Sequence, residues 1–246
     1  MDIVYSGFSD IGKLPDIMED FIDVFDLNGI KFMCIADGLG GKKGSHVASN
    51  IAIYEFKKYL SNIGYFDYST LDTHIQHITY TINKILVAYQ MANPNVYSSF
   101  STTLTVVAVD YYGQSKVYHI GNTRAYLIRE GTFHQLTRDD TIAQELAEKG
   151  EISFQEINNH PERAHLTKVL GSDNSDLSIT VGTFFPRDTI IMMTNGVYEV
   201  LSENDLRELL LAFSNNSLDE LVKNIIKSVN EISGIDNSAL IVATLN

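Results

Sequence analysis

The chain has few of the residues on which several classes of protein depend. It has one cysteine, Cys34, no tryptophan, and 18 basic against 31 acidic residues, which gives a formal net charge of -13. A single cysteine cannot form an internal disulfide, and because Cys34 lies in an apolar run we expect a buried thiol rather than a nucleophile. The excess of acidic residues argues against nucleic-acid binding, which needs clustered lysine and arginine.

Long apolar runs are also missing. No stretch approaches the roughly 20 consecutive apolar residues of a membrane span, and the N-terminus lacks the basic segment and apolar core of a signal peptide. We therefore expect no membrane association and a cytoplasmic location. Because 44% of the 246 residues are hydrophobic, the chain can bury one large core, and we expect a single domain over residues 1–246.

Strand and helix patterns are segregated along the chain. Asn28-Gly29 predicts a hairpin turn between strands 21–27 and 30–36, and Ser45 is predicted to cap a helix that reaches about Ile63. This segregation predicts an α+β fold of two packed antiparallel β-sheets flanked by pairs of helices. The other expected strands are 3–8, 102–110, 116–120, 124–129, 132–136, 177–184, 189–193 and 239–244, and the other expected helices are 71–89, 142–149, 154–158, 203–213 and 218–228.

The segment 31–41 is an apolar strand that leads a carboxylate, Asp37, into a glycine-rich turn. Glycines let the backbone turn sharply and approach a ligand closely, so a metal site could form at this strand end. An Asp-Gly pair is also a common turn signal, and for the motif alone both interpretations stay open.

Three other pairs share this context at predicted strand ends: Glu19-Asp20, Asn195-Gly196 and Asp236-Asn237. Hard cations such as Mg²⁺ and Mn²⁺ prefer several oxygen ligands, and two of them can share a bridging carboxylate. Taken singly, each pair is more often a solvated surface group in a chain so rich in acidic residues.

Seven short motifs follow one another along the chain in a set order. In this order they resemble the motifs of the metal-dependent Ser/Thr protein phosphatases of the PPM (type 2C) family. The resemblance implies two packed sheets with helices outside and a flap over about 139–171 beside the active site. The motifs are Ser9-Asp10-Ile11-Gly12 leading to Glu19-Asp20, Ala36-Asp37-Gly38-Leu39-Gly40-Gly41, Ser101-Thr102-Thr103-Leu104, His119-Ile120-Gly121-Asn122-Thr123-Arg124-Ala125-Tyr126, Gln135-Leu136-Thr137-Arg138-Asp139-Asp140, Thr194-Asn195-Gly196 and Asp236-Asn237.

The resemblance also implies roles for the acidic residues. Asp37 would bridge two cations, Mn²⁺ or Mg²⁺, with the Gly38 carbonyl as a further ligand. Asp236 would be a terminal ligand of the first cation, and Glu19 and Asp20 would hold waters of the second. Water is the nucleophile in this family, so no side chain is implied to be catalytic. The implied partner is a phosphorylated protein, and we expect a monomer that opposes a Ser/Thr kinase.

Three departures from the family pattern bear on catalysis. The family usually has aspartate at Asn195, a ligand position of the first cation, and at Asn122, where a third and weaker metal is implied. An amide supplies a neutral oxygen, so we expect weaker binding of the first cation. Pro15 stands where the family has its phosphate-binding arginine, and Met18 where it has asparagine, which leaves the phosphate-binding group unknown. The nearby candidate cations are Lys13, Lys42 and Lys43.

Four further side chains are expected to have other roles. Leu39 stands where some family members have a histidine proposed as general acid, so this role is excluded here. His46 and His119 are expected to be surface, capping or core residues, because hard cations do not prefer imidazole. Arg124 is expected to support a strand end rather than to bind substrate.

Two functional hypotheses stay open from the sequence. The first is a working metal-dependent protein serine/threonine phosphatase, which rests on the four carboxylates above. The second is a catalytically weak or inactive pseudophosphatase that acts as a binding or regulatory module, which rests on the three departures.

Overall fold

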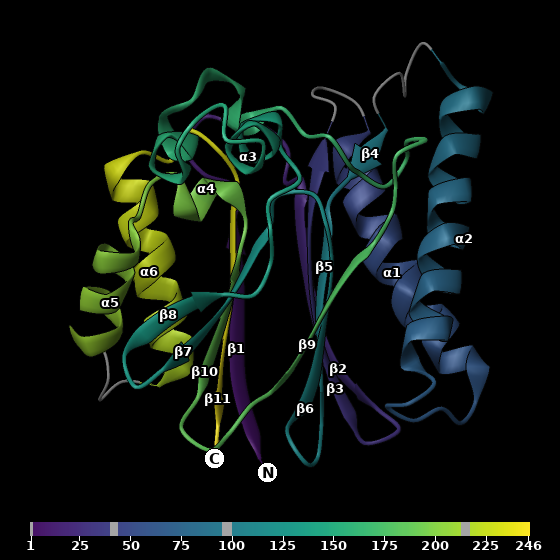
Figure 1. The fold of residues 1–246 in the computed structure, drawn as a ribbon, viewed down its shortest axis with the longest axis horizontal. Helices are drawn as coiled ribbons and strands as arrows, with labels where there is room; N and C mark the ends of the chain where they lie inside the picture. Colours follow the sequence, from purple (N-terminus) through teal and green to yellow (C-terminus); the bar gives the residue numbers. More distant parts are fainter. Residues whose placement is uncertain (1, 40–43, 95–99, 213–216) are drawn as a thin grey trace.

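The structure, a computed structural model, describes residues 2–39, 44–94, 100–212 and 217–246. Two antiparallel sheets pack face to face, and helices cover the outer face of each (Figure 1). The expected α+β sandwich is therefore confirmed. The N- and C-termini lie together at one end of the sandwich, whereas the flap (residues 139–171) and the short helix α4 (Asn195–Tyr198) lie at the opposite end (Figure 1).

The first sheet has the strand order β2-β3-β5-β6-β9, with the short β4 paired to the end of β3. The predicted hairpin at Asn28-Gly29 joins β2 to β3, and both residues have the positive φ that such a turn requires. The strands are β2 (Asp20–Leu27), β3 (Ile30–Leu39), β4 (Ser101–Thr102), β5 (Leu104–Asp110), β6 (Gln114–Ile120) and β9 (Ser178–Thr183).

The second sheet has the strand order β1-β11-β10-β7-β8. Its strand β11 pairs antiparallel with β1 on one side and with the central strand β10 on the other. The strands are β1 (Ile3–Asp10), β7 (Arg124–Arg129), β8 (Thr132–Gln135), β10 (Thr189–Met193) and β11 (Ser238–Leu245).

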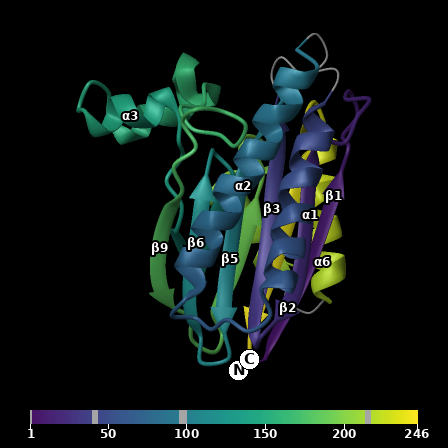
Figure 2. The same ribbon diagram turned by 90° about the vertical axis from the view of Figure 1, so that its right-hand side faces the viewer.

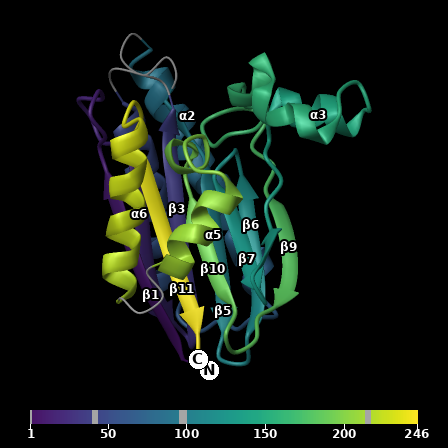
Figure 3. The ribbon, with the colours of Figure 1, turned by 90° about the vertical axis from the view of Figure 1, so that its left-hand side faces the viewer.

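Helices bury their apolar faces on the outside of the sheets. α1 (Ser45–Ile63) and α2 (Leu71–Ala92) cover the first sheet, whereas α5 (Glu203–Ala212) and α6 (Leu218–Ile232) cover the second (Figures 2 and 3). A third apolar cluster fills the space between the sheets. The short helix α4 (Asn195–Tyr198) follows β10 directly.

The flap, residues 139–171, leaves the sandwich between β8 and β9. It contains α3 (Ile142–Glu148) and the 3-10 helices η1 (Phe154–Asn159) and η2 (Pro161–Ala164), and it projects beyond the sheets (Figures 2 and 3). Within the described residues, no helix is long and apolar enough to cross a membrane.

Three details differ from the sequence-based expectations. The helix cap is Gly44 with a φ of 128°, whereas Ser45 is the first helical residue and donates its hydroxyl to Glu19 instead. The predicted strand 102–110 is interrupted at Thr103, which separates β4 from β5. Helix α4 was not predicted, because four residues are too few for helical periodicity to show.

Candidate active site

The candidate site lies where strand ends of the two sheets meet. Asp20 at the start of β2 is the register partner of Asp37 near the end of β3. Thr194, which follows β10 in the other sheet, donates its hydroxyl to Asp20 Oδ2 at 2.7 Å. The structure thus brings the predicted residues Asp20 and Asp37 together and joins them to the neighbouring sheet.

The backbone of Asp37 is held by the two threonines where the β4–β5 strand is interrupted. Its amide donates to Thr103 Oγ1 at 2.8 Å, and its carbonyl accepts from the Thr103 amide at 2.9 Å and from Thr102 Oγ1 at 2.8 Å. These bonds restrain the carboxylate at a fixed strand end. They also give a structural reason for the Ser101-Thr102-Thr103 motif.

Two glycines allow close approach of the backbone around these strand ends. A Cβ added at Gly38 would lie 2.2 Å from the carbonyl oxygen of Ser45, and one added at Gly196 would lie 1.8 Å from that of Asn237. Real Cβ atoms do not approach a backbone oxygen so closely, so both positions require glycine. This packing does not test the role of the Gly38 carbonyl as a metal ligand, which stays a prediction.

Buried negative charge is the main electrostatic feature of the site. Asp20 is 2% exposed and Asp37 is 9% exposed. Burial raises the pKa of Asp37 well above its usual range, and the charges of Asp20, Asp236 and Glu19 raise it further. Burial likewise raises the pKa of Asp20 to about 7, against the opposing effect of the Thr194 hydrogen bond. A divalent cation would relieve this repulsion.

The donor set fits a hard cation, because it consists of carboxylate, amide and backbone oxygens. Within the described parts of the chain, no three acidic, histidine or cysteine side chains already converge into a complete ligand cluster. Side chains such as the exposed Asp236 would therefore have to rotate to bring the carboxylates together around a cation.

Asn195 and Asp236, both implied ligands of the first cation, lie side by side. Its Nδ2 donates to Asp236 Oδ2 at 3.1 Å, while Asp236 Oδ1 accepts from the Asn237 amide at 2.8 Å. Asn237 Oδ1 in turn accepts from the Glu19 amide at 2.6 Å. A series of hydrogen bonds thus connects the pair to Glu19 through Asn237, and the amide of Asn195 orients the Asp236 carboxylate.

Glu19 is held by two serines of α1 that the sequence interpretation missed. Ser45 donates to the Glu19 carboxylate, and Ser49 donates to the Glu19 carbonyl oxygen. The Glu19 carbonyl also accepts from the Gly38 amide at 3.1 Å. A serine at this spacing on a helix has no distinctive sequence signal, because its partner lies in a distant loop.

Asn122 is buried at the turn between β6 and β7, with 5% of its surface exposed. Its Oδ1 has no hydrogen-bond partner among the described residues. A buried acceptor of this kind is costly when unpaired, so the position suits a donor or a cation. Its assignment to a third metal stays a prediction.

Of the candidate phosphate-binding cations, Lys13 lies in the loop between β1 and β2. The amide of Lys13 donates to the Gly234 carbonyl at 2.7 Å, and its side chain lines a groove with Asp10 and Asn230 against α6. Pro15 is half-buried in the same loop. Lys42 and Lys43 lie outside the described residues, as do Gly40 and Gly41.

Arg124 and His119 both have hydrogen-bond partners within the protein, and Arg124 also lines a groove beside the flap. Arg124 makes a bidentate ion pair with Asp139, with Nη2 2.7 Å from Oδ2, and lies 3.9 Å from the ring centroid of Tyr198. His119 is buried, and its Nδ1 and Nε2 are bonded to Thr105 Oγ1 and to the Arg138 carbonyl. Burial lowers the pKa of His119.

A groove of about 530 Å³ runs between the flap and the sandwich next to this site. Ile157, Asn158 and Arg163 form its flap wall, and Tyr198 and Glu199 contribute to the opposite wall. Burial raises the pKa of the Tyr198 hydroxyl, and the charge of Asp139 raises it further against the opposing effect of Arg124. Tyr198 belongs to α4, the helix that begins at the predicted ligand Asn195.

The chain is similar to a known family over most of its length. The sequence model of the family described as Protein phosphatase 2C matches residues 16–231. The chain belongs to this family. This chain is 27% identical over 241 residues to serine/threonine phosphatase stp of Listeria welshimeri, covering 97% of this chain and 94% of that protein. It is 23% identical over 256 residues to protein phosphatase PhpP of Streptococcus pneumoniae, covering 98% and 97%.

Solved structures show the same fold. The serine/threonine phosphatase of S. agalactiae superimposes with a TM-score of 0.92 at 22% identity, covering 100% of both chains. The catalytic domain of the phosphatase PstP, solved with 2 manganese ions, has a TM-score of 0.82 at 23% identity and covers 99% of both chains. Phosphatases of the 2C family are metal-dependent, and their substrates are phosphoproteins.

Proposed function

We propose that this chain hydrolyses phosphoserine and phosphothreonine in proteins, using two divalent cations at the carboxylates of the facing strand ends. Family membership supports the activity, and the relatives named above are called phosphatases, so the pseudophosphatase alternative is not favoured. The observation that carries the metal site is the buried Asp20–Asp37 pair, whose charges no described lysine or arginine offsets by an ion pair.

The proposed ligands follow from the sequence and from their positions at the strand ends. Bound cations of this kind would lower the pKa of water and neutralise charge on phosphate oxygens. The chain's own residues would restrain the site: Thr102 and Thr103 hold Asp37, and Asn195 orients Asp236. The proposed ligands are Asp37, Gly38, Asp236 and Asn195, with Glu19 and Asp20 holding waters and Asn122 at a third position.

Phosphate release with Mn²⁺ tests this function directly. The purified protein is offered a chromogenic aryl phosphate and a phosphothreonine peptide, with and without millimolar Mn²⁺, and Mg²⁺ is compared at the same concentration. We expect metal-dependent release from both substrates, with Mn²⁺ the better cofactor. No release above the metal-free control would contradict the proposal and support the pseudophosphatase.

We also propose that the enzyme works as a monomer and opposes a Ser/Thr kinase. Light scattering after gel filtration measures the first property, and a mass near the 27.5 kDa of one chain is expected. Dephosphorylation of a substrate that a co-purified or co-encoded Ser/Thr kinase has labelled tests the second. The cytoplasmic location stays a prediction.

A further inference from the structure

A buried carboxylate at the base of the flap has no role in the proposed chemistry. Asp140 is 3% exposed and lies where the chain leaves the sandwich for the flap. Two segments, 138–141 and 165–168, connect the flap to the sandwich, and we call them the stalk. A buried carboxylate is costly unless it is paired and hydrogen-bonded, so the contacts of Asp140 indicate its purpose.

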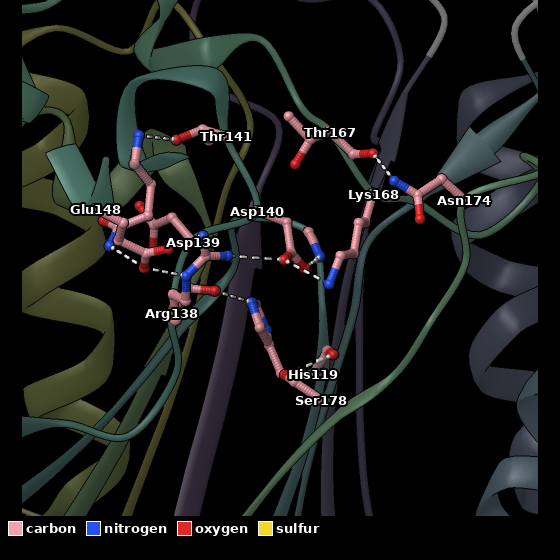
Figure 4. Close-up of polar contacts among 12 residues, drawn as sticks. His119, Arg138, Asp139, Asp140, Thr141, Glu148, Thr167, Lys168, Asn174 and Ser178 are labelled. Carbon is pink, nitrogen blue, oxygen red and sulfur yellow. Dashed lines mark hydrogen bonds and ion pairs between the residues drawn. The ribbon is translucent and has the colours of Figure 1, made fainter. Parts of the chain in front are cut away.

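Asp140 joins both stalk segments to the body of the protein. Its Oδ1 lies 3.3 Å from Arg138 Nη1 in the entering segment and 3.6 Å from Lys168 Nζ in the leaving segment, and its Oδ2 accepts from the Gly121 amide at 3.0 Å (Figure 4). Its amide donates to the Gly121 carbonyl at 2.7 Å, and its carbonyl accepts from the Thr167 amide at 2.8 Å. One residue thus fixes three segments.

The stalk is connected to the strand that carries Asp37. The residue Leu170, just after the stalk, exchanges two backbone hydrogen bonds with Thr102, at 3.0 and 2.9 Å. Thr102 is the residue whose hydroxyl donates to the Asp37 carbonyl. On the entering side, the Arg138 carbonyl accepts from His119 Nε2 at 2.9 Å. Both segments therefore start from positions set by the first sheet.

The far end of the flap is held much less firmly. The Arg163 guanidinium lies 3.4 Å from Glu199 on the opposite wall of the groove, and the two side chains are 43% and 34% exposed. Exposed pairs of this kind contribute little. The other link, from Arg124 Nη2 to Asn158, is long at 3.5 Å. The orientation of the flap wall is therefore set mainly at the stalk.

We propose that Asp140 is a positioning residue for the protein substrate. Through Arg138 and Lys168 it fixes the angle of the flap, and thereby the width of the groove that receives the polypeptide around the phosphorylated side chain. This inference rests on the proposed function. An aryl phosphate is too small to occupy the groove, so it reports on the carboxylate site alone.

The variant Asp140→Asn tests the proposal, because it keeps the shape of the side chain and removes its charge. We expect the KM for a phosphothreonine peptide to rise about tenfold, since small displacements of substrate-positioning groups have effects of this size or larger. We expect kcat/KM for the aryl phosphate to stay within about twofold, and amide hydrogen exchange over residues 142–164 to become faster.

Glu145→Gln is the matched control. Glu145 lines the same pocket as Asp140, Arg138 and Lys168, and in the described structure it makes no ion pair with the stalk. The control removes the same charge and should leave the KM for the peptide and the exchange rates unchanged. An equal rise in KM for Asp140→Asn and Glu145→Gln would overturn the proposal, because it would point to net charge rather than to the stalk.

Lys168→Met provides a second variant if Asp140→Asn folds poorly, since it removes only one of the contacts. It should raise the KM for the peptide by a smaller factor, and in the Asp140→Asn background it should add nothing. Equal losses on both substrates, or an unchanged KM for the peptide, would overturn the positioning role. If the unmodified protein hydrolyses neither substrate, the proposed function fails instead, and unchanged exchange in the flap would then reject the stalk contacts separately.

Discussion

Two strand ends face each other at the candidate site and are built on the same backbone plan. β3 carries Asp37-Gly38 directly before its last residue, Leu39, and β10 leads through Thr194 into Asn195-Gly196 at the start of α4. In each, glycine is required because a neighbouring carbonyl oxygen leaves no room for a Cβ. In each, the residue before the glycine carries a side-chain oxygen, so the same local arrangement of residues appears twice.

The two ends differ in charge. Asp37 is a buried carboxylate whose pKa is raised by burial and by three neighbouring acids, whereas Asn195 is a neutral amide that donates to Asp236. Both ends thus have the required glycine, but of the two residues that precede a glycine only Asp37 carries a charge that could hold a cation. We therefore expect the neutral Asn195 to lower the affinity of the first cation site.

The largest effect is expected from removal of the charged end. Asp37→Asn should lower metal-dependent phosphate release about a thousandfold or more, as loss of a central catalytic group does. The thermal midpoint of the metal-free protein should not fall, because the substitution relieves repulsion between buried carboxylates. Steady-state kinetics at saturating Mn²⁺ measure the first effect and calorimetry the second. Activity of Asp37→Asn within tenfold of the parent would show that the Asp37 carboxylate is not required for phosphate release.

The next effect concerns the glycine that both strand ends require. Gly196→Ala should destabilise the fold by about 3 kcal/mol, because the new methyl group would overlap the Asn237 carbonyl. For a domain of this size that corresponds to a fall in Tm of roughly 6–12 °C. Gly182→Ala is the control, since its Cβ would meet only the Ser115 hydroxyl, at 3.3 Å. Equal Tm values for the two variants would show that the close approach is not required.

A smaller effect is expected when the neutral end is given a charge. Asn195→Asp should lower the Kd for Mn²⁺ about tenfold, because an anionic oxygen replaces a neutral one beside Asp236. Isothermal titration calorimetry provides the measurement. Asn62→Asp, on the exposed face of α1, controls for the change in net charge. If both variants bind Mn²⁺ alike, Asn195 does not face the cation.

The smallest expected effect is a change in how stability depends on pH, and it comes from His119. His119 is buried on β6 and its pKa is lowered by burial, so the unfolded chain binds a proton that the folded chain does not. The associated stability is complete above the unfolded pKa of about 6.5 and is lost as the pH falls below it, by at most about 1.4 kcal/mol per pH unit. Urea unfolding from pH 7 to pH 5 measures this slope, and His119→Gln should reduce it. An equal slope in the variant would assign it to other groups.

Most of the fold could be predicted from the sequence, because the long apolar strands and amphipathic helices carry clear periodicity. The hairpin at Asn28-Gly29 is confirmed for the same reason, since its turn chemistry is local. The cap at Ser45 was wrong, because a distant residue, Glu19, competes for its hydroxyl. Local patterns cannot show such competition.

The candidate site was predicted less completely. The family resemblance implied one site for the acidic motifs, and the structure places Asp20 beside Asp37 and Asn195 beside Asp236, whereas their roles as ligands stay predictions. The supporting serines of α1 and the stalk contacts of Asp140 were not foreseen, because they join segments far apart in the sequence. Their residue types are common on any surface, so only the fold reveals them.

The central claim is that the carboxylates at the β3 end hold the catalytic cations. Titration of Mn²⁺ into the parent protein and into Asp37→Asn, followed by calorimetry at equal protein concentration, tests it most directly. We predict that the parent binds Mn²⁺ with measurable heat and that Asp37→Asn loses this binding while remaining folded. Unchanged affinity and stoichiometry in the folded variant would contradict the account.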